Sequence, residues 1–201
     1  LSDAKTAGMA LGPSTLLAQR LVFSPSTRKL ELEALKLVLS GKQGTSGFGA
    51  SLEWPQLSVD GEQLKGSGFS GRINLEGKTT LAGRFESGAP SGNFDALRLP
   101  AFALKLDGAS GPRKIDGQLK SNLLLRPGRS AGTLERLELR ANIAEPGLQP
   151  LVLSLGGTAG VDERGTQWAL QGALNNNKFE SNGSAAFNAA VPTVQANARF
   201  D

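Results

Sequence analysis

Side chains that carry out catalysis or hold metals are scarce in this chain of 201 residues. The sequence contains no His, no Cys and no Tyr. This composition excludes Ser-His and Cys-His nucleophiles, imidazole or thiolate metal sites, redox dithiols and disulfides. Because an enzyme built from this chain would have to use Asp, Glu, Lys, Ser or Thr, we expect a protein with no catalytic residues, no bound metal and no cofactor.

Pairs of carboxylates come closest to an acid–base arrangement. Glu31/Glu33, Glu135/Glu138 and Asp162/Glu163 could serve hydrolysis only if one member of a pair lay in an apolar pocket that raised its pKa. Each pair stands beside charged or turn residues. We therefore interpret these carboxylates as the solvent-facing side of strands.

Two glycine-rich segments match known motifs only in part. Residues 66–71 read G-x-G-x-x-G, but a dinucleotide site needs a helix directly afterwards, and residues 72–76 alternate like a strand instead. Residues 156–162 resemble one calcium-binding nonapeptide without the repeat that would build a β-helix. We interpret the second segment as a hairpin or the end of a glycine-rich strand.

The charge of the chain is spread along its length. There are 22 Lys and Arg against 18 Asp and Glu, and the longest basic runs are Arg28-Lys29 and Arg113-Lys114. A nucleic-acid interface would gather this charge and interleave aromatic residues, so we expect no nucleic-acid partner. The sequence has no apolar run of about 18 residues, the length that spans a bilayer. Because the chain opens at Leu1 without Met, we expect a piece of a longer protein.

Alternation of apolar and polar residues is the dominant pattern that would position any site. It recurs from residues 35–39 through 97–106, 115–125, 137–143 and 151–155 to 168–174 and 194–200, with Gly, Asn and Pro between the segments. This pattern predicts an all-β, antiparallel meander of about ten to twelve strands in a single domain over residues 1–201. Residues 1–15 are expected to be helical or poorly ordered, with a helical turn over Ser2–Ala10.

Leucine dominates the apolar positions, which leaves two points open. Leu134–Glu145 fits a helix almost as well as a strand, and we favour a strand because the alternation holds across many segments. Rows of Leu suit either the core of a closed sandwich or a broad surface that adapts to acyl chains.

Shifts in the phase of the alternation predict bends. They fall at Ala34-Leu35 and at Pro100, where a bulge would re-aim the following side chains and curl the sheet. Trp54-Pro55 is predicted to end a strand, and Trp168 lies in phase with Leu170. Both tryptophans are interpreted as anchors of the apolar core.

From about residue 156 to residue 201 the chain resembles the AsmA family of bacterial envelope proteins. The segments that carry the resemblance are residues 168–174, 179–187 and 192–201, the last of which ends in Phe200-Asp201; residues 97–100 and 103–108 also look like repeats of that family. The resemblance implies a long curled antiparallel sheet with an apolar inner groove. It also implies a periplasmic location, an N-terminal helix at the inner membrane, and a role in outer-membrane biogenesis that moves phospholipid.

The in-phase apolar residues are the candidates for such a groove. They are Leu35, Leu37, Leu39, Leu97, Leu99, Leu104, Leu106, Leu119, Leu123, Leu153 and Leu155. The expected partners are phospholipid or another acyl-chain ligand, the inner membrane and other envelope proteins. The alternative is a closed β-sandwich that acts as a scaffolding or adhesion module and has no lipid groove.

Overall fold

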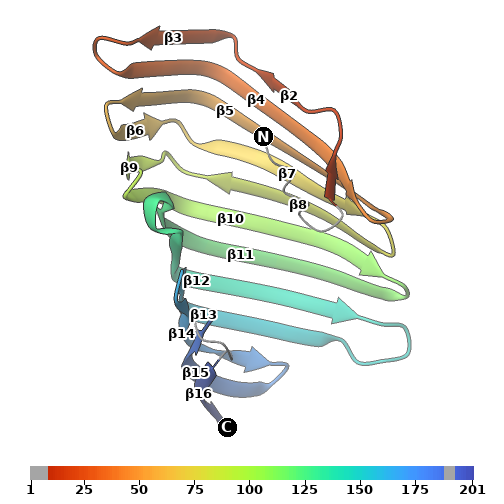
Figure 1. Cartoon of the computed structure of the whole chain (residues 1–201). Coiled ribbons are helices and arrows are strands. Elements are labelled where there is room, and N and C mark those ends of the chain that lie inside the picture. Colours follow the sequence, from red (N-terminus) through yellow and green to blue (C-terminus); the bar gives the residue numbers. More distant parts are fainter. Residues whose placement is uncertain (1–8, 188–192) are drawn as a thin grey trace.

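The computed structural model describes residues 9–187 and 193–201, which form a single layer of β-structure (Figure 1). One short 3-10 turn is the only helical element in these ranges. The elements in chain order are β1 (Met9–Leu11), β2 (Thr15–Leu17), β3 (Arg20–Ser24), β4 (Lys29–Gln43), β5 (Ser46–Asp60), β6 (Gln63–Gly66), β7 (Phe69–Glu76), β8 (Thr79–Ser87), β9 (Ser91–Asn93), β10 (Ala96–Ser110), β11 (Arg113–Arg126), η1 (Pro127–Arg129), β12 (Ala131–Ala144), β13 (Leu151–Asp162), β14 (Gly165–Leu174), β15 (Asn177–Ala186) and β16 (Thr193–Phe200). The predicted all-β class is confirmed.

The strands form one antiparallel sheet of sixteen strands. These strands occupy twelve positions across the sheet, because β1, β2 and β3 all pair with β4, β6 and β7 both pair with β5, and β8 and β9 both pair with β10. The predicted meander of about ten to twelve strands matches these positions. The number of separate strands is larger because three of the positions are interrupted along the chain.

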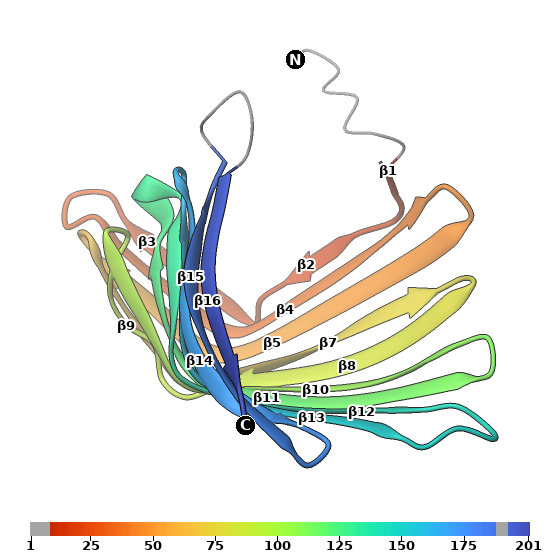
Figure 2. The same ribbon diagram turned by 90° about the horizontal axis from the view of Figure 1, so that it is seen from below.

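The sheet is curled and open on one side. Seen along the direction in which the strands stack, the long strands bend into arcs, and hairpin turns form both edges (Figure 2). All substantial contacts between strands join sheet neighbours, and η1 contacts β12. No described element therefore packs against either face, and the closed β-sandwich considered as an alternative is wrong for this architecture.

A line of backbone irregularities, which we call the crease, bends the long strands. It passes through Ala34 in β4, Ala101 in β10 and Arg136 in β12, which have positive φ angles of 50°, 50° and 53°. The pairing register shifts at Ala101 and at Arg136, so β10 and β12 each carry one extra residue there. At Ala34 the register is kept, and the β4–β5 pairing is only interrupted, between the pairs Glu33–Gln56 and Leu35–Trp54. The bulge predicted at Pro100 is confirmed. The irregularity predicted at Ala34-Leu35 is present as a positive φ angle and an interruption of the pairing, without the extra residue of a bulge.

Several local expectations can be compared with the described residues. The segment Leu134–Glu145 lies in strand β12 except for its last residue, as favoured from the sequence. Residues 1–8 of the expected N-terminal helical turn lie outside the described residues, and Met9 and Ala10 belong to β1 instead of a helix. Trp54-Pro55 does not end a strand: it lies inside β5, where Pro55 has no paired residue on β4 and therefore needs no backbone N–H for the ladder.

Candidate functional site

Cross-strand pairing aligns apolar residues in one row that crosses the whole sheet. From the N-terminal to the C-terminal edge the row consists of Leu16, Leu37, Leu52, Gly71, Phe85, Leu104, Leu119, Leu139, Leu155, Gly172, Phe179 and Phe200. Neighbouring strands lie about 4.8 Å apart, so the twelve positions extend over about 53 Å. We call this set the apolar row.

The next row along the strands points to the opposite face, because successive side chains of a strand alternate. Its members in β4 to β16 are Lys36, Glu53, Ser70, Glu86, Ala103, Lys120, Glu138, Gly156, Gln171, Glu180 and Arg199. Seven of these eleven residues are charged. One face of the sheet is therefore apolar along its length, and the other face is polar.

All eleven groove residues predicted from the sequence lie on the face of the apolar row. Leu37, Leu104, Leu119 and Leu155 belong to the row itself. Leu35, Leu39, Leu106 and Leu153 lie two residues from a row member on the same strand. Leu97, Leu99 and Leu123 lie beyond the crease, where β11 continues without an extra residue and Leu123 pairs with Leu99.

Sequence reasoning missed other members of this face. Leu52, Phe85 and Leu139 were not among the predicted groove residues, although they stand between predicted ones in the apolar row. Each of them alternates in phase with its neighbours in the sequence, which was the available signal. Only the pairing register shows that they join separate leucines into a continuous surface.

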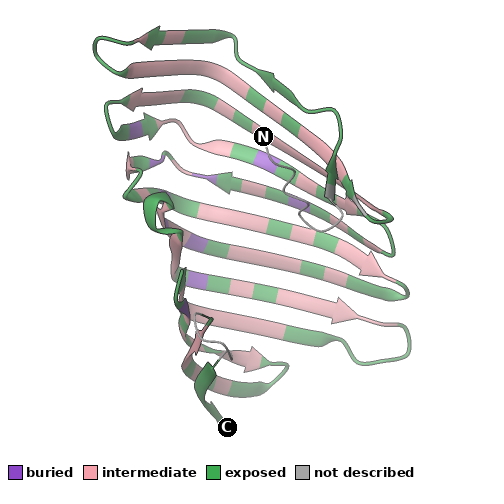
Figure 3. Ribbon diagram, in the orientation of Figure 1, coloured by how far each residue is buried: buried purple, intermediate pink, exposed green. Residues whose placement is uncertain are grey.

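The apolar face is also the more buried face: along strands such as β7, β8 and β12, residues of the apolar face are intermediate or buried and many of the alternate residues are exposed, which gives the banded ribbon of Figure 3. Leu99 and Leu137 are only 8% and 6% exposed, although no described element packs over them; on the opposite face Leu124, at 8%, is the exception. In a single curved layer, such burial comes from neighbouring side chains on the same face. Side chains converge on the concave side of a curved sheet and spread apart on the convex side. The apolar face is therefore the concave face.

Short polar side chains satisfy the backbone groups that the crease bulges expose. The hydroxyl of Ser87 donates to the carbonyl oxygen of Pro100 at 3.2 Å, and that of Ser121 donates to the carbonyl oxygen of Glu135 at 2.9 Å. The side-chain oxygen of Asn122 accepts the backbone N–H of Ala101 at 3.0 Å. These bonds allow the bulges to lie within an apolar face without leaving the bulge groups unpaired.

Both tryptophans lie on the concave face, with the indole N–H satisfied. Trp54 packs against Phe69 with ring centroids 4.9 Å apart, and its N–H donates to the carbonyl oxygen of Ser67 at 3.1 Å. The N–H of Trp168 donates to the hydroxyl of Ser181 at 3.1 Å. The two rings thus present apolar surface to the concave side while their polar ends are bonded to the sheet.

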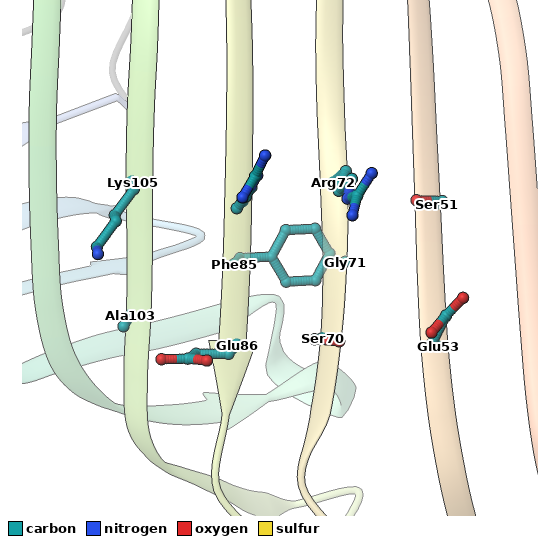
Figure 4. Close-up of a pocket in the computed structure, with 10 residues that line it drawn as sticks. Ser51, Glu53, Ser70, Gly71, Arg72, Phe85, Glu86, Ala103 and Lys105 are labelled. Atoms are coloured by element: carbon teal, nitrogen blue, oxygen red, sulfur yellow. The ribbon is translucent and has the colours of Figure 1, made fainter.

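Glycines in the sheet lie beneath aromatic rings. Figure 4 shows the ring of Phe85 reaching from β8 toward Gly71 on β7. A Cβ atom added to Gly71 would meet this ring, and one added to Gly183 would meet the ring of Trp168. The missing side chains therefore let the rings lie across the neighbouring strand, so that apolar surface covers backbone.

The convex face carries a shallow polar hollow of about 470 Å³. Arg72, Arg84 and Lys105 are direct cross-strand neighbours in it, and Glu53 and Glu86 lie in the adjacent row (Figure 4). The carboxylate of Glu53 is paired with Lys36 at 3.1 Å. The hollow thus combines exposed charges of both signs, in contrast to the concave face.

Three of the carboxylates considered in the sequence as acid–base candidates have ion-pair or hydrogen-bond partners in the structure. Glu31 pairs with Lys29 at 2.6 Å, and the hydrogen bond and charge of Lys29 lower the pKa of Glu31. Glu33 pairs with Arg20 at 3.0 Å. The carboxylate of Asp162 accepts the backbone N–H groups of the turn that follows it, at 2.8 and 3.1 Å. Within residues 9–187 and 193–201, no three acidic residues come together as a metal site.

Comparisons with protein-family models, with curated proteins and with solved structures give no match to this chain. In the described part of the chain, no helix combines the length and the apolar character needed to cross a bilayer. The functional argument therefore depends on the geometry of the concave face.

Proposed function

We propose that the concave face binds the acyl chains of phospholipids and lets them move along the apolar row. The observation that carries this proposal is the continuity of the row: twelve strand positions in succession present Leu, Phe or Gly on the same face. No charged residue interrupts the row. Hydrocarbon is the ligand chemistry that such a surface matches.

The energetics support binding without a specific anchor. Burial of a methylene group contributes about 0.8 kcal/mol, and partial burial on an open face contributes correspondingly less. Because successive positions along the row are chemically alike, a chain that shifts by one strand exchanges like contacts for like. A face of this kind holds hydrocarbon while opposing its movement only weakly.

The length of the row supports a conduit over a pocket for one molecule. The hydrocarbon core of a bilayer is about 30 Å thick, so one leaflet accounts for about 15 Å. The row, at about 53 Å, exceeds that length more than threefold. Several acyl chains can therefore lie along it in sequence.

The proposed setting follows the resemblance to the AsmA family. In this proposal the chain is a non-catalytic periplasmic segment at the bacterial inner membrane that takes part in outer-membrane biogenesis. An N-terminal membrane helix outside this sequence and other envelope proteins would be its neighbours. The segments that carry the resemblance, residues 168–174 and 179–187, lie in strands β14 and β15 for most of their length.

The experiment compares aspartate placed on the two faces. Leu104→Asp and Leu153→Asp put a charge on the concave face, whereas Ala103→Asp and Ser154→Asp put the same charge one residue away on the convex face. The probe is a phosphatidylcholine with a fluorophore at the end of one acyl chain, whose emission rises in apolar surroundings. We expect the concave variants to lose most of the signal and the convex variants to keep it.

Circular dichroism and thermal unfolding check that each variant is folded. Where an aspartate variant does not fold, Leu104→Ser replaces it and should weaken binding less strongly. Absence of lipid binding by the unaltered chain, or equal loss in the concave and convex variants, would contradict the proposal.

A further inference from the structure

The two edges of the curled sheet differ in charge. Five strand ends with their turns lie along one edge, which we call the basic edge, and they comprise residues 42–47, 76–79, 110–114, 144–151 and 174–178 (Figure 2). The turns of this edge carry five cations, Lys42, Lys78, Arg113, Lys114 and Lys178, and two carboxylates, Glu76 and Glu145. Asp201, whose backbone N–H donates to the carbonyl oxygen of Lys178, adds a third carboxylate at the C-terminal end of this edge. The pairing register, which alternates turns between edges, brings these residues together.

The opposite edge has no charge excess. It comprises residues 24–29, 60–63, 93–96, 126–131 and 162–165. It carries Arg28, Lys29, Arg126, Arg129 and Arg164, which are balanced by Asp60, Glu62, Asp95, Asp162 and Glu163. We call it the mixed edge. Because both edges border the same concave face, that face has an excess of positive charge along one border and no excess along the other.

Four lysines of the basic edge have no ion-pair partner among the described residues. Arg113 is engaged with Glu145 at 2.7 Å, but Lys42, Lys78, Lys114 and Lys178 take part in no ion pair there. Lys42, Lys78 and Lys114 are exposed, and they stand at three consecutive turns of this edge. Successive turns are two strands apart, which places one free ammonium group about every 10 Å.

Lysine suits an anionic ligand that enters at varying positions. Lys78 lies in its turn, while Lys42 and Lys114 start from the convex face close to theirs. The long apolar stem of each lysine lets the ammonium group reach the edge. A phosphate group held there would leave its attached hydrocarbon free to lie on the concave face.

We propose that the basic edge binds the phosphate of anionic phospholipid headgroups whose acyl chains lie on the concave face. This inference rests on the proposed function and adds a substrate class: lipids with a net negative headgroup, such as phosphatidylglycerol, are preferred over zwitterionic ones. In phosphatidylcholine the cationic choline offsets the phosphate, so the attraction of the unpaired lysines is reduced. The mixed edge gives no comparable attraction for an anion, because its cations are balanced by carboxylates.

The experiment measures preference between two lipids with the same labelled acyl chain, phosphatidylglycerol and phosphatidylcholine, at low ionic strength. The test variant carries Lys42→Gln, Lys78→Gln and Lys114→Gln. The matched control removes the same charge from the mixed edge through Arg28→Gln, Arg129→Gln and Arg164→Gln, which are also exposed turn residues. Exposed charge pairs suggest that the unaltered chain prefers phosphatidylglycerol by about threefold to tenfold. We expect the lysine variant to lose this preference and the arginine control to keep most of it.

The outcomes separate this inference from the proposed function. If the unaltered chain binds both lipids equally, or if both triple variants lose the preference alike, the basic edge is not a headgroup site, although acyl-chain binding stands. If the chain binds neither lipid, the proposed function itself fails. Competition by soluble glycerol phosphate identifies the source of the anion: weak competition supports a headgroup tethered by its chains, and full competition at equal concentration overturns the lipid assignment in favour of a free phosphate site.

Discussion

The central and C-terminal parts of the concave face have the same backbone arrangement but different side chains. In the centre, the apolar row passes through Leu104, Leu119 and Leu139 in adjacent strands. In β14 to β16 small residues are frequent, and the large side chains include Trp168 and the pair Phe179 and Phe200, whose ring centroids are 6.0 Å apart. Every residue of β16 is exposed. Phe200 is large and still 70% exposed, because β16 ends the sheet and has a neighbouring strand on one side only. The comparison shows that the burial of a side chain on a single layer depends on neighbours on both sides as well as on its size.

The largest expected difference comes from the same truncation in both parts. Leu137 in β12 is 6% exposed and Leu174 in β14 is 38% exposed, and both lie on the concave face. We expect Leu137→Ala to lower the free energy of unfolding by about 2–4 kcal/mol, because its neighbours cannot fill the space. Leu174→Ala should cost less than about 1 kcal/mol, because its side chain is already partly in water. Urea unfolding measures both, and equal losses would show that the two parts are packed alike.

Glycine substitutions test whether aromatic cover constrains the centre. A Cβ atom at Gly71 would meet the ring of Phe85 and the backbone oxygen of Ser51, and the backbone cannot move aside cheaply. At Gly117, on the same face, the nearest atom would be the carbonyl oxygen of Arg140 at 3.6 Å, an ordinary contact. We expect Gly71→Ala to destabilise the chain by about 1–3 kcal/mol.

Gly117→Ala should change stability by less than about 0.5 kcal/mol, since surface-type substitutions without steric conflict fall in that range. Thermal unfolding of the two variants side by side provides the measurement. A larger loss for Gly117→Ala than for Gly71→Ala would refute the close approach of the ring.

Two serines sharpen the comparison at the level of single hydrogen bonds. Ser121 is 5% exposed and donates to the carbonyl oxygen of Glu135 in the crease, whereas Ser181 accepts the indole N–H of Trp168 near the C-terminal edge. Ser121→Ala leaves a buried carbonyl oxygen without this partner, so we expect a loss of about 1–2 kcal/mol.

Ser181→Ala exposes the indole N–H to water, and its cost should stay below about 1 kcal/mol. Unfolding in urea gives both values. The contrast between centre and edge would disappear if Ser181→Ala proved the more damaging change.

The smallest expected effect concerns charges on the convex face at the two ends. Lys29 lowers the pKa of Glu31, so the ion pair adds stability above the unfolded-state pKa of Glu, and this stability is lost as the pH falls through the lowered value. Arg199 and Asp201 at the other end lie 3.9 Å apart, at the limit of pairing. We expect Glu31→Gln to reduce slightly the acid sensitivity of the urea midpoint, and Arg199→Gln to leave it unchanged. The reverse order would mean that the C-terminal pair is the stronger one.

The all-β fold was predictable from the alternation of apolar and polar residues, because each strand has one apolar side and one solvent-facing side. Whether a second layer covers the apolar side was not predictable, because a sandwich strand and an open strand such as residues 102–106 show the same pattern. The position of Trp54-Pro55 inside a strand was not predictable, because a proline usually marks the end of a strand. Here the strand continues past Pro55, since the pairing with β4 is interrupted at that residue. The grouping of Lys42, Lys78 and Lys114 on one edge depends on which turns the pairing register brings together.

The way in which strands contact only their immediate neighbours has a consequence for how such a chain can change over evolutionary time. From β10 to β16 each strand is paired with the strands that precede and follow it in the sequence wherever both exist. Duplication or deletion of a hairpin would lengthen or shorten the sheet by about 10 Å while the remaining pairings persist. The span that the molecule bridges is therefore set by a count of hairpins, and selection can adjust it in steps without redesigning the rest of the protein.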